Sequence, residues 1–145
     1  MKKRLTAIAI CFVLVFTMTI MSSAVSSKTI KRELSSGATA TSSLSWFEPF
    51  PNTTETTGSG TATTSINRAQ LCNVSVTISG TYVSGGNSIQ STYSMNDTQY
   101  YDNGAGGINA ATASVIAPGY GYWSSLGSDH TAYYAGARDS WIMIK

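Results

Sequence analysis

Apolar and polar residues alternate along much of the second half of the chain. In LCNVSVTISG, residues 71–80, four apolar side chains alternate with Asn, Ser and Thr. A period of two turns one face of a strand toward a core and the other toward water. The run therefore predicts a half-buried strand, which extends toward Tyr82.

Further strands follow the same rule. After a glycine turn at Ser84–Asn87, residues 88–95 (SIQSTYSM) alternate again and complete a hairpin. The segment Ile108–Ala117 is rich in alanine, which favours a helix, but its Thr, Ser, Val and Ile residues favour a strand. Within it, Ala111, Ala113 and Val115 alternate with Thr112 and Ser114. We predict a strand there. The last two strands are expected at Asp129–Tyr134 and Ser140–Ile144.

Glycine-rich and polar stretches separate these runs. We expect a loop at residues 96–107 (NDTQYYDNGAGG), with a short strand at Gln99–Tyr101, and a turn at Pro118–Trp123. Five or six short strands without an amphipathic helix are typical of a small antiparallel β-sandwich or an open barrel. The sequence therefore predicts an all-β domain over residues 66–145.

The first 24 residues have the pattern of a secretory signal peptide. Lys2, Lys3 and Arg4 precede an apolar run of about 17 residues, and the small residues Ser22–Ala24 follow it. A run of this length is at the short limit for a membrane span. We expect cleavage after Ala24, release into the medium, and no stable membrane insertion afterwards.

Residues 25–65 are dominated by Ser, Thr, Gly and Ala. They contain few large apolar groups to offset the entropy of ordering the backbone, so we expect a flexible or weakly extended segment. An aromatic island at residues 45–51 (SWFEPFP) interrupts it. This island is expected to dock as an edge strand on the following domain, or to serve as a short recognition segment.

Charge and cysteine content narrow the range of functions. Without the first 24 residues, six cations and seven anions remain, so the basic patch that nucleic-acid binding requires is absent. Cys72 is then the single cysteine, either a buried apolar side chain or a free thiol that joins two chains. One histidine and one cysteine do not make a zinc set, and the acidic loop lacks EF-hand spacing. We expect no metal and no cofactor.

The single histidine, His130, is the obvious catalytic candidate. Its neighbour Asp129 points to the opposite face of a strand, so it is poorly placed to orient the ring. No serine lies in a nucleophile-elbow motif. We interpret His130 as a structural, hydrogen-bonded residue; a binding or pH-sensing role and a small hydrolase remain alternatives.

Aromatic residues are the most suggestive surface feature. Tyr120, Tyr122 and Trp123 lie in a glycine-flanked segment, and further tyrosines are nearby in sequence: Tyr100, Tyr101, Tyr133 and Tyr134. Exposed aromatic rings stack on sugars and anchor protein interfaces, whereas alternate rings in strands are often core. The candidate binding residues are therefore Tyr120, Tyr122, Trp123, His130 and Tyr133.

The lysine-led signal peptide, the strand NVSVTISGTY and the ending SDHTAYYAGARDSW resemble those of small, uncharacterised secreted β-proteins of Gram-positive bacteria. A more distant resemblance is to bacteriocins of the lactococcin 972 type, which are also exported, β-rich, and rich in Tyr, Gly, Ser and His. That resemblance implies antibacterial activity. The long Ser/Thr segment and the single histidine depart from the bacteriocin pattern.

These observations lead to a ranked set of functions. We expect a secreted, non-enzymatic β-sandwich that binds cell-wall polysaccharide or a surface protein. The alternatives are a bacteriocin-like antibacterial protein, a self-assembling extracellular protein that pairs through the uncharged strand SVTISGTY, and a hydrolase built around His130.

Overall fold

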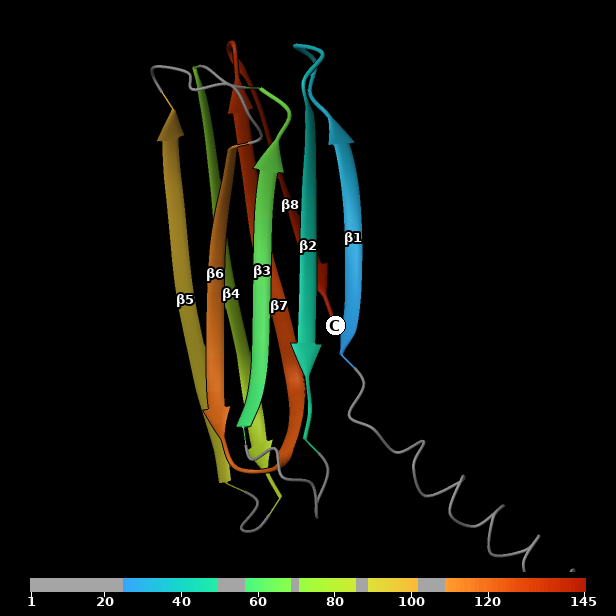
Figure 1. The fold of residues 1–145 in the computed structure, drawn as a ribbon, viewed down its shortest axis with the longest axis vertical. Coiled ribbons are helices and arrows are strands. Elements are labelled where there is room, and N and C mark those ends of the chain that lie inside the picture. Colours follow the sequence, from blue (N-terminus) through green and yellow to red (C-terminus); the bar gives the residue numbers. More distant parts are fainter. Residues whose placement is uncertain (1–24, 50–56, 69–70, 86–88, 102–108) are drawn as a thin grey trace, which may run out of the picture.

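The computed structural model describes residues 25–49, 57–68, 71–85, 89–101 and 109–145. They form eight strands in two four-stranded sheets that pack face to face (Figure 1). The strands are β1 (Ser26–Glu33), β2 (Thr39–Phe47), β3 (Thr57–Ile66), β4 (Cys72–Ser84), β5 (Ile89–Tyr101), β6 (Asn109–Pro118), β7 (Gly121–Tyr134) and β8 (Ala137–Ile144). The described part of the chain contains no helix that meets the length and hydropathy of a membrane span.

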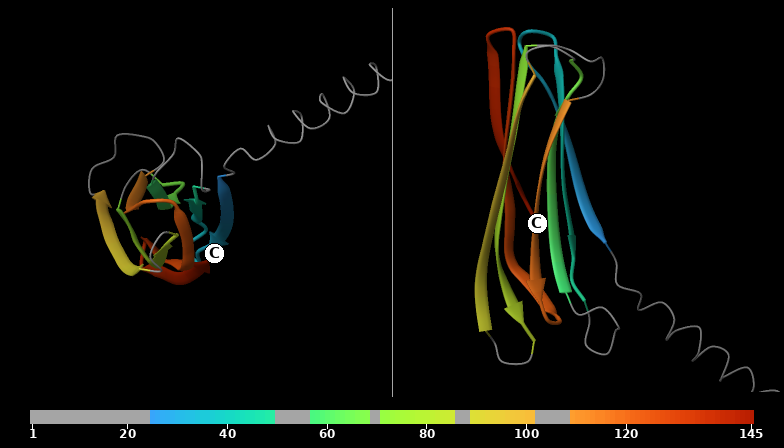
Figure 2. Two further views of the ribbon diagram at one scale, coloured as in Figure 1. Left: turned by 90° about the horizontal axis from the view of Figure 1, so that it is seen from below. Right: turned by 60° about the vertical axis from the view of Figure 1, so that its left-hand side comes forward.

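The chain crosses between the two sheets three times. The first sheet has the order β1-β2-β3-β6 and the second has β5-β4-β7-β8, and all neighbouring strands are antiparallel. Figure 2 shows the two layers end-on, with the core between them. The predicted all-β sandwich is therefore confirmed.

The prediction of a flexible segment at residues 25–65 is wrong for the part that the structure describes, residues 25–49 and 57–65. This segment supplies β1, β2 and β3, three of the four strands of the first sheet. Many of its inward positions are small: Ala40 and Ser42 in β2, and Gly58 and Gly60 in β3, are all buried, while Leu44 is a large buried side chain of β2. Small side chains bury little area themselves, but they let the second sheet approach closely.

The second sheet supplies the large groups that fill this space. A Cβ on Gly58 would lie 2.4 Å from the Tyr82 ring, and one on Gly60 would lie 3.1 Å from Ile78. Tyr82 and Trp123 make an edge-to-face ring contact with centroids 5.0 Å apart. Burial raises the pKa of Tyr82 to about 12, with smaller contributions from Glu48 and Tyr93, and its hydroxyl donates to the carbonyl of Gly119 at 2.9 Å.

The predicted strands in the second half are present, and three of them, β5, β7 and β8, are clearly longer than expected. The hairpin β4–β5 and the strand at Asn109–Pro118 are confirmed, the latter over the helical alternative. The loop predicted at residues 96–107 is wrong for residues 96–98, which continue β5, whereas the short strand predicted at Gln99–Tyr101 is present as the end of β5. Residues 102–107 lie outside the described part. The turn predicted at Pro118–Trp123 is only two residues long, because β7 begins at Gly121.

The aromatic island is not an edge strand. Trp46 and Phe47 end β2, which lies between β1 and β3, while Phe50 and Pro51 fall outside the described residues. The prediction that the strand SVTISGTY pairs with another chain through an open edge is wrong for the same reason, because this strand is not at an edge of its sheet either. That segment lies in β4, which is hydrogen-bonded to β5 on one side and β7 on the other. It has no free edge to offer another chain.

Cys72 is buried, as the alternation predicted. Its side chain is 4% exposed, and its sulfur accepts a hydrogen bond from the Asn109 amide at 3.2 Å. The thiol also lies 3.5 Å from the carbonyl of Arg68. In this position the thiol acts as a core group, and it cannot join two folded chains without local opening.

Candidate functional site

His130 lies in the core, stacked on Trp141 with ring centroids 5.9 Å apart. Its Nδ1 is 2.8 Å from the hydroxyl of Thr64, and its Nε2 is 2.7 Å from the hydroxyl of Ser128. Burial lowers the pKa of His130 to about 4, and the nearby charge of Asp129 opposes that shift more weakly. The ring is therefore neutral at ordinary pH, and Asp129 lies on the opposite, exposed face of β7.

The hydrogen bonds define the tautomer. The Thr64 hydroxyl donates to the carbonyl of Ser75 at 3.0 Å, so it accepts from the Nδ1–H group of His130. The Ser128 hydroxyl then donates a hydrogen bond to the unprotonated Nε2. This is the local geometry of a serine–histidine pair. Ser128 and His130 are only 2% and 1% exposed, so a substrate cannot reach them in the folded protein.

The five predicted binding residues do not form one platform. Trp123 and His130 are buried, which removes both from any ligand surface. Tyr122 and Tyr133 are exposed on β7 but lie eleven residues apart, roughly 36 Å at about 3.3 Å per residue. Tyr120 lies in the β6–β7 turn, where its carbonyl accepts a hydrogen bond from the Gly85 backbone at 2.8 Å.

Tyr133 lines a hollow together with Asn73 and Tyr100, which we name the tyrosine pocket. Asn73 of β4 pairs with Tyr100 of β5 on one side and with Tyr133 of β7 on the other. Two exposed tyrosines thus flank one amide on the outer face of the second sheet. They border a hollow of about 400 Å³, whose other lining residues are Leu71, Cys72 and Ala135.

The backbone around the tyrosine pocket is strained. Leu71 and Ala135 have φ angles of 52° and 49°, and they are the only described non-glycine residues with positive φ. Both line the pocket. An L-residue in this region costs about 1–2 kcal/mol, and such strain is common at functional sites. The pocket therefore combines an unusual backbone with exposed aromatic side chains.

The tyrosine pocket is uncharged. None of its six lining residues carries a charge, and no side-chain hydrogen bond joins Asn73, Tyr100 or Tyr133 to another described residue. The nearest cation by register is Arg138 of β8, which pairs with Tyr133. The pocket thus offers two ring faces, two hydroxyls and one amide to a neutral polar ligand.

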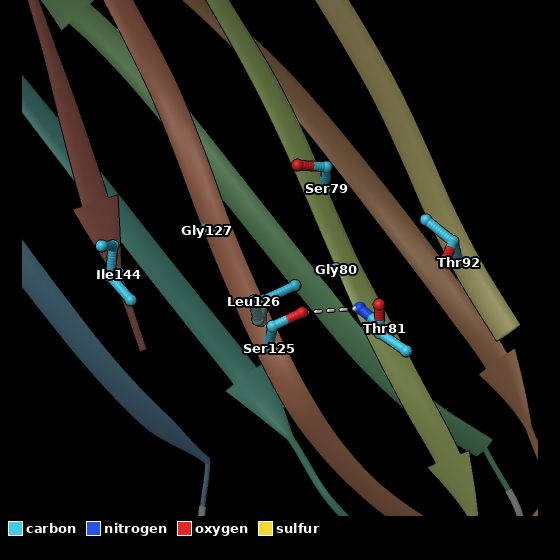
Figure 3. Close-up of a pocket in the computed structure, with 8 residues that line it drawn as sticks. All are labelled: Ser79, Gly80, Thr81, Thr92, Ser125, Leu126, Gly127 and Ile144. Carbon is cyan, nitrogen blue, oxygen red and sulfur yellow. Dashed lines mark hydrogen bonds between the residues drawn. The ribbon is translucent and has the colours of Figure 1, made fainter. Parts of the chain in front are cut away.

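A second hollow, which we name the bulge groove, opens on the same face (Figure 3). Its volume is about 340 Å³. Ser79 of β4 pairs with Gly127 of β7, and because neither has a large side chain, they form the floor of the groove. Thr92 of β5 and Ile144 of β8 border the groove on either side.

A β-bulge shapes this groove. Ser124 is an extra residue in β7, because Thr81 pairs with Ser125 while Tyr82 pairs with Trp123. The two serine hydroxyls bind the backbone of Thr81: Ser125 accepts its N–H at 3.3 Å, and Ser124 donates to its carbonyl at 3.1 Å. Bulges re-aim strands and side chains and are frequent beside functional sites.

Metal binding finds no support in these hollows. Among the residues that the structure describes, no group of three or more His, Cys, Asp or Glu side chains is placed to hold an ion. Comparisons with protein-family models, curated proteins and solved structures gave no match. The two hollows are therefore the candidate binding sites among the described residues.

Sequence reasoning identified Tyr133 but missed Asn73 and Tyr100 as its partners. The signal was present in part, since Asn73 and Tyr100 occupy polar-face positions of runs that were read as strand or loop. What was missing was the pairing of β4 with both β5 and β7, which brings the three residues into one row.

Proposed function

We propose that this protein is a secreted, non-enzymatic binding module whose tyrosine pocket holds a neutral sugar of the cell envelope. The observation that carries the proposal is the row Tyr100–Asn73–Tyr133. Aromatic faces pack on the apolar C–H faces of sugar rings, and an amide between them bonds ring hydroxyls. The proposal includes export by a signal peptide at residues 1–24, inferred from the sequence pattern.

The pocket favours a sugar over a folded protein as its ligand. A stable protein interface buries about 800 Å² on each partner and is anchored by a cluster of large groups. The pocket has two exposed rings and four smaller lining residues. It matches a small ring-shaped ligand, and Asn73 and Tyr133 lie on the two central strands of the second sheet, while Tyr100 lies on the edge strand β5 that is paired with β4.

Co-sedimentation with purified Gram-positive cell walls tests the proposal. We expect the protein to be retained, and Tyr100→Ala or Tyr133→Ala to weaken retention by about tenfold each, roughly 1.4 kcal/mol. Tyr122→Ala is the matched control, because Tyr122 is an exposed tyrosine of the same strand at its far end. It should bind as the wild type does.

Two results would overturn the proposal. The first is no retention of folded wild-type protein by walls. The second is equal retention of wild type and a Tyr100→Ala/Tyr133→Ala double variant that keeps its fold by circular dichroism. Growth inhibition of related strains, measured with the same preparations, is the readout for the antibacterial alternative.

A further inference from the structure

The tyrosine pocket and the bulge groove lie on one line. In β4, Asn73 of the pocket and Ser79 of the groove are six residues apart, and in β7 the same interval separates Tyr133 from Gly127. An even interval keeps side chains on the same face of a strand. The two hollows therefore open in the same direction, about 20 Å apart along the strands.

Short polar side chains occupy the strip between the two hollows. By register, Ser75 pairs with Thr131 and Thr77 pairs with Asp129 across β4 and β7. All four point outward, away from the buried positions that alternate with them. None is long enough to block a chain that lies over the sheet, and each offers a hydroxyl or carboxylate oxygen to it.

We infer that this strip and its two hollows form a track for a linear, uncharged polysaccharide that lies lengthwise along β4 and β7. The inference rests on the proposed function and extends it from a single sugar ring to a chain. One ring stacks in the tyrosine pocket, the hydroxyls of the strip bond the following rings, and a later ring sits in the bulge groove beside Ile144.

Shape and charge both select this occupant. The two hollows lie about 20 Å apart along the strands, so an extended, β-linked chain can reach both, whereas a coiled glycan would reach one hollow alone. Asp129 stands in the middle of the strip, and Arg138 is level with the tyrosine pocket at its end. A phosphate-rich polymer would be repelled at Asp129, so neutral chains are preferred.

Filling the groove tests the track. We expect Ser79→Gln to weaken binding to purified walls by about tenfold, because its longer side chain occupies the groove floor. Ser94→Gln is the matched control: Ser94 pairs with Ser79 and is exposed on the same face, but it does not line the groove. It should bind within about twofold of wild type.

Competition by soluble oligomers of N-acetylglucosamine gives the second readout. We expect the hexasaccharide to displace wall-bound protein at about tenfold lower concentration than the disaccharide does, and Ser79→Gln to abolish that difference. The track is overturned if Ser79→Gln binds walls as Ser94→Gln does, or if oligomers compete independently of length or fail to compete. If Tyr133→Ala still loses binding in that case, the proposed function survives alone; absence of any wall binding removes both.

Discussion

At the scale of single residues, His130 shows how an ionisable group can serve the core. Both ring nitrogens are bonded to hydroxyls, of Thr64 and Ser128, and the ring is stacked on Trp141. Protonation would require Nε2 to become a donor, so the Ser128 hydroxyl would have to turn its proton elsewhere inside the core. The arrangement therefore stabilises the neutral ring.

This arrangement predicts a loss of stability in acid. The pKa of His130 is about 4 in the folded protein, against 6.5 for an ordinary histidine. Below pH 6.5 His130 binds a proton in the unfolded chain, whereas in the folded protein it binds one only near pH 4. The free energy of unfolding should therefore fall through this window, by roughly 3 kcal/mol from this group.

Urea unfolding at a series of pH values from 7.5 to about 4 checks this prediction. His130→Gln serves as the reference, since it retains the carboxylates that also titrate in acid but lacks the imidazole. We expect its slope against pH to be shallower than that of wild type between pH 6.5 and 4. Parallel slopes for the two proteins would show that His130 is not the group responsible.

At the scale of elements, the β7–β8 hairpin carries strain. Ala135 and Gly136 form its two-residue turn and both have positive φ, at 49° and 83°. Asn is the favoured first residue of such turns, because it tolerates this region better than Ala does. Ala135→Asn should raise the free energy of unfolding by about 0.5–1 kcal/mol.

The midpoint of thermal unfolding of Ala135→Asn checks this prediction, and Gly136→Ala is a second variant that should shift the midpoint in the opposite direction. We expect Gly136→Ala to lower the midpoint, because it places a second Cβ in the left-handed region. A lower midpoint for Ala135→Asn than for wild type would contradict this account of the turn.

The first sheet explains what the sequence could and could not reveal. Alternation predicted β4 because large or branched apolar side chains mark its inner face, and it predicted β6 because Ala111, Ala113 and Val115 alternate with Thr112 and Ser114. In β3 the inner face begins with Gly58 and Gly60, whose packing partners Tyr82 and Leu126 lie in the second sheet. The sequence of β3 alone therefore does not show an apolar inner face at Gly58 and Gly60, because the large side chains that pack there come from the second sheet.

The tyrosine pocket was hidden for a related reason. Its residues Asn73, Tyr100 and Tyr133 come from three strands, and a shift of one residue in any pairing would turn one of them inward. Local patterns do not determine that register. The bulge at Ser124, which shapes the groove, likewise depends on the pairing with Thr81.

At the scale of the whole molecule, charged side chains bridge both open sides of the sandwich. On one side, the Asp97 carboxylate of β5 accepts the backbone N–H of Thr112 in β6 at 2.8 Å. On the other, the Lys28 ammonium of β1 donates to the carbonyl of Ile144 in β8 at 2.7 Å. Each bridge satisfies a backbone group on an edge strand, where another chain would otherwise pair.

Removing the bridge between β5 and β6 should therefore destabilise that side of the sandwich. Asp97→Ala leaves the Thr112 N–H group without its charged partner, and we expect a loss of about 1–2 kcal/mol in the free energy of unfolding. Faster aggregation on mild heating should accompany it. Asp139→Ala is the control, because Asp139 accepts the N–H of its own neighbour Ser140. Equal stability of the two variants would refute the bridging role.

A third set of contacts, made by Glu48 and Lys145 with the backbone of Trp123, lies near the bulge. Glu48 accepts the backbone N–H of Trp123 at 2.7 Å and forms an ion pair with Lys145, whose ammonium also donates to the Trp123 carbonyl at 2.8 Å. These contacts hold β7 next to the bulge residue Ser124. They give the groove a rigid support that the sequence pattern alone did not indicate.

The most direct test of the central claim is to map the ligand on the protein by NMR. Amide signals of isotope-labelled protein would be followed while soluble fragments of cell-wall glycan are added. We predict shifts at Asn73, Tyr100 and Tyr133, and none at Tyr122 beyond the end of the track or on the outer face of the first sheet. Shifts confined to the first sheet, or no shifts at concentrations that saturate wall binding, would contradict a glycan site on β4, β5 and β7.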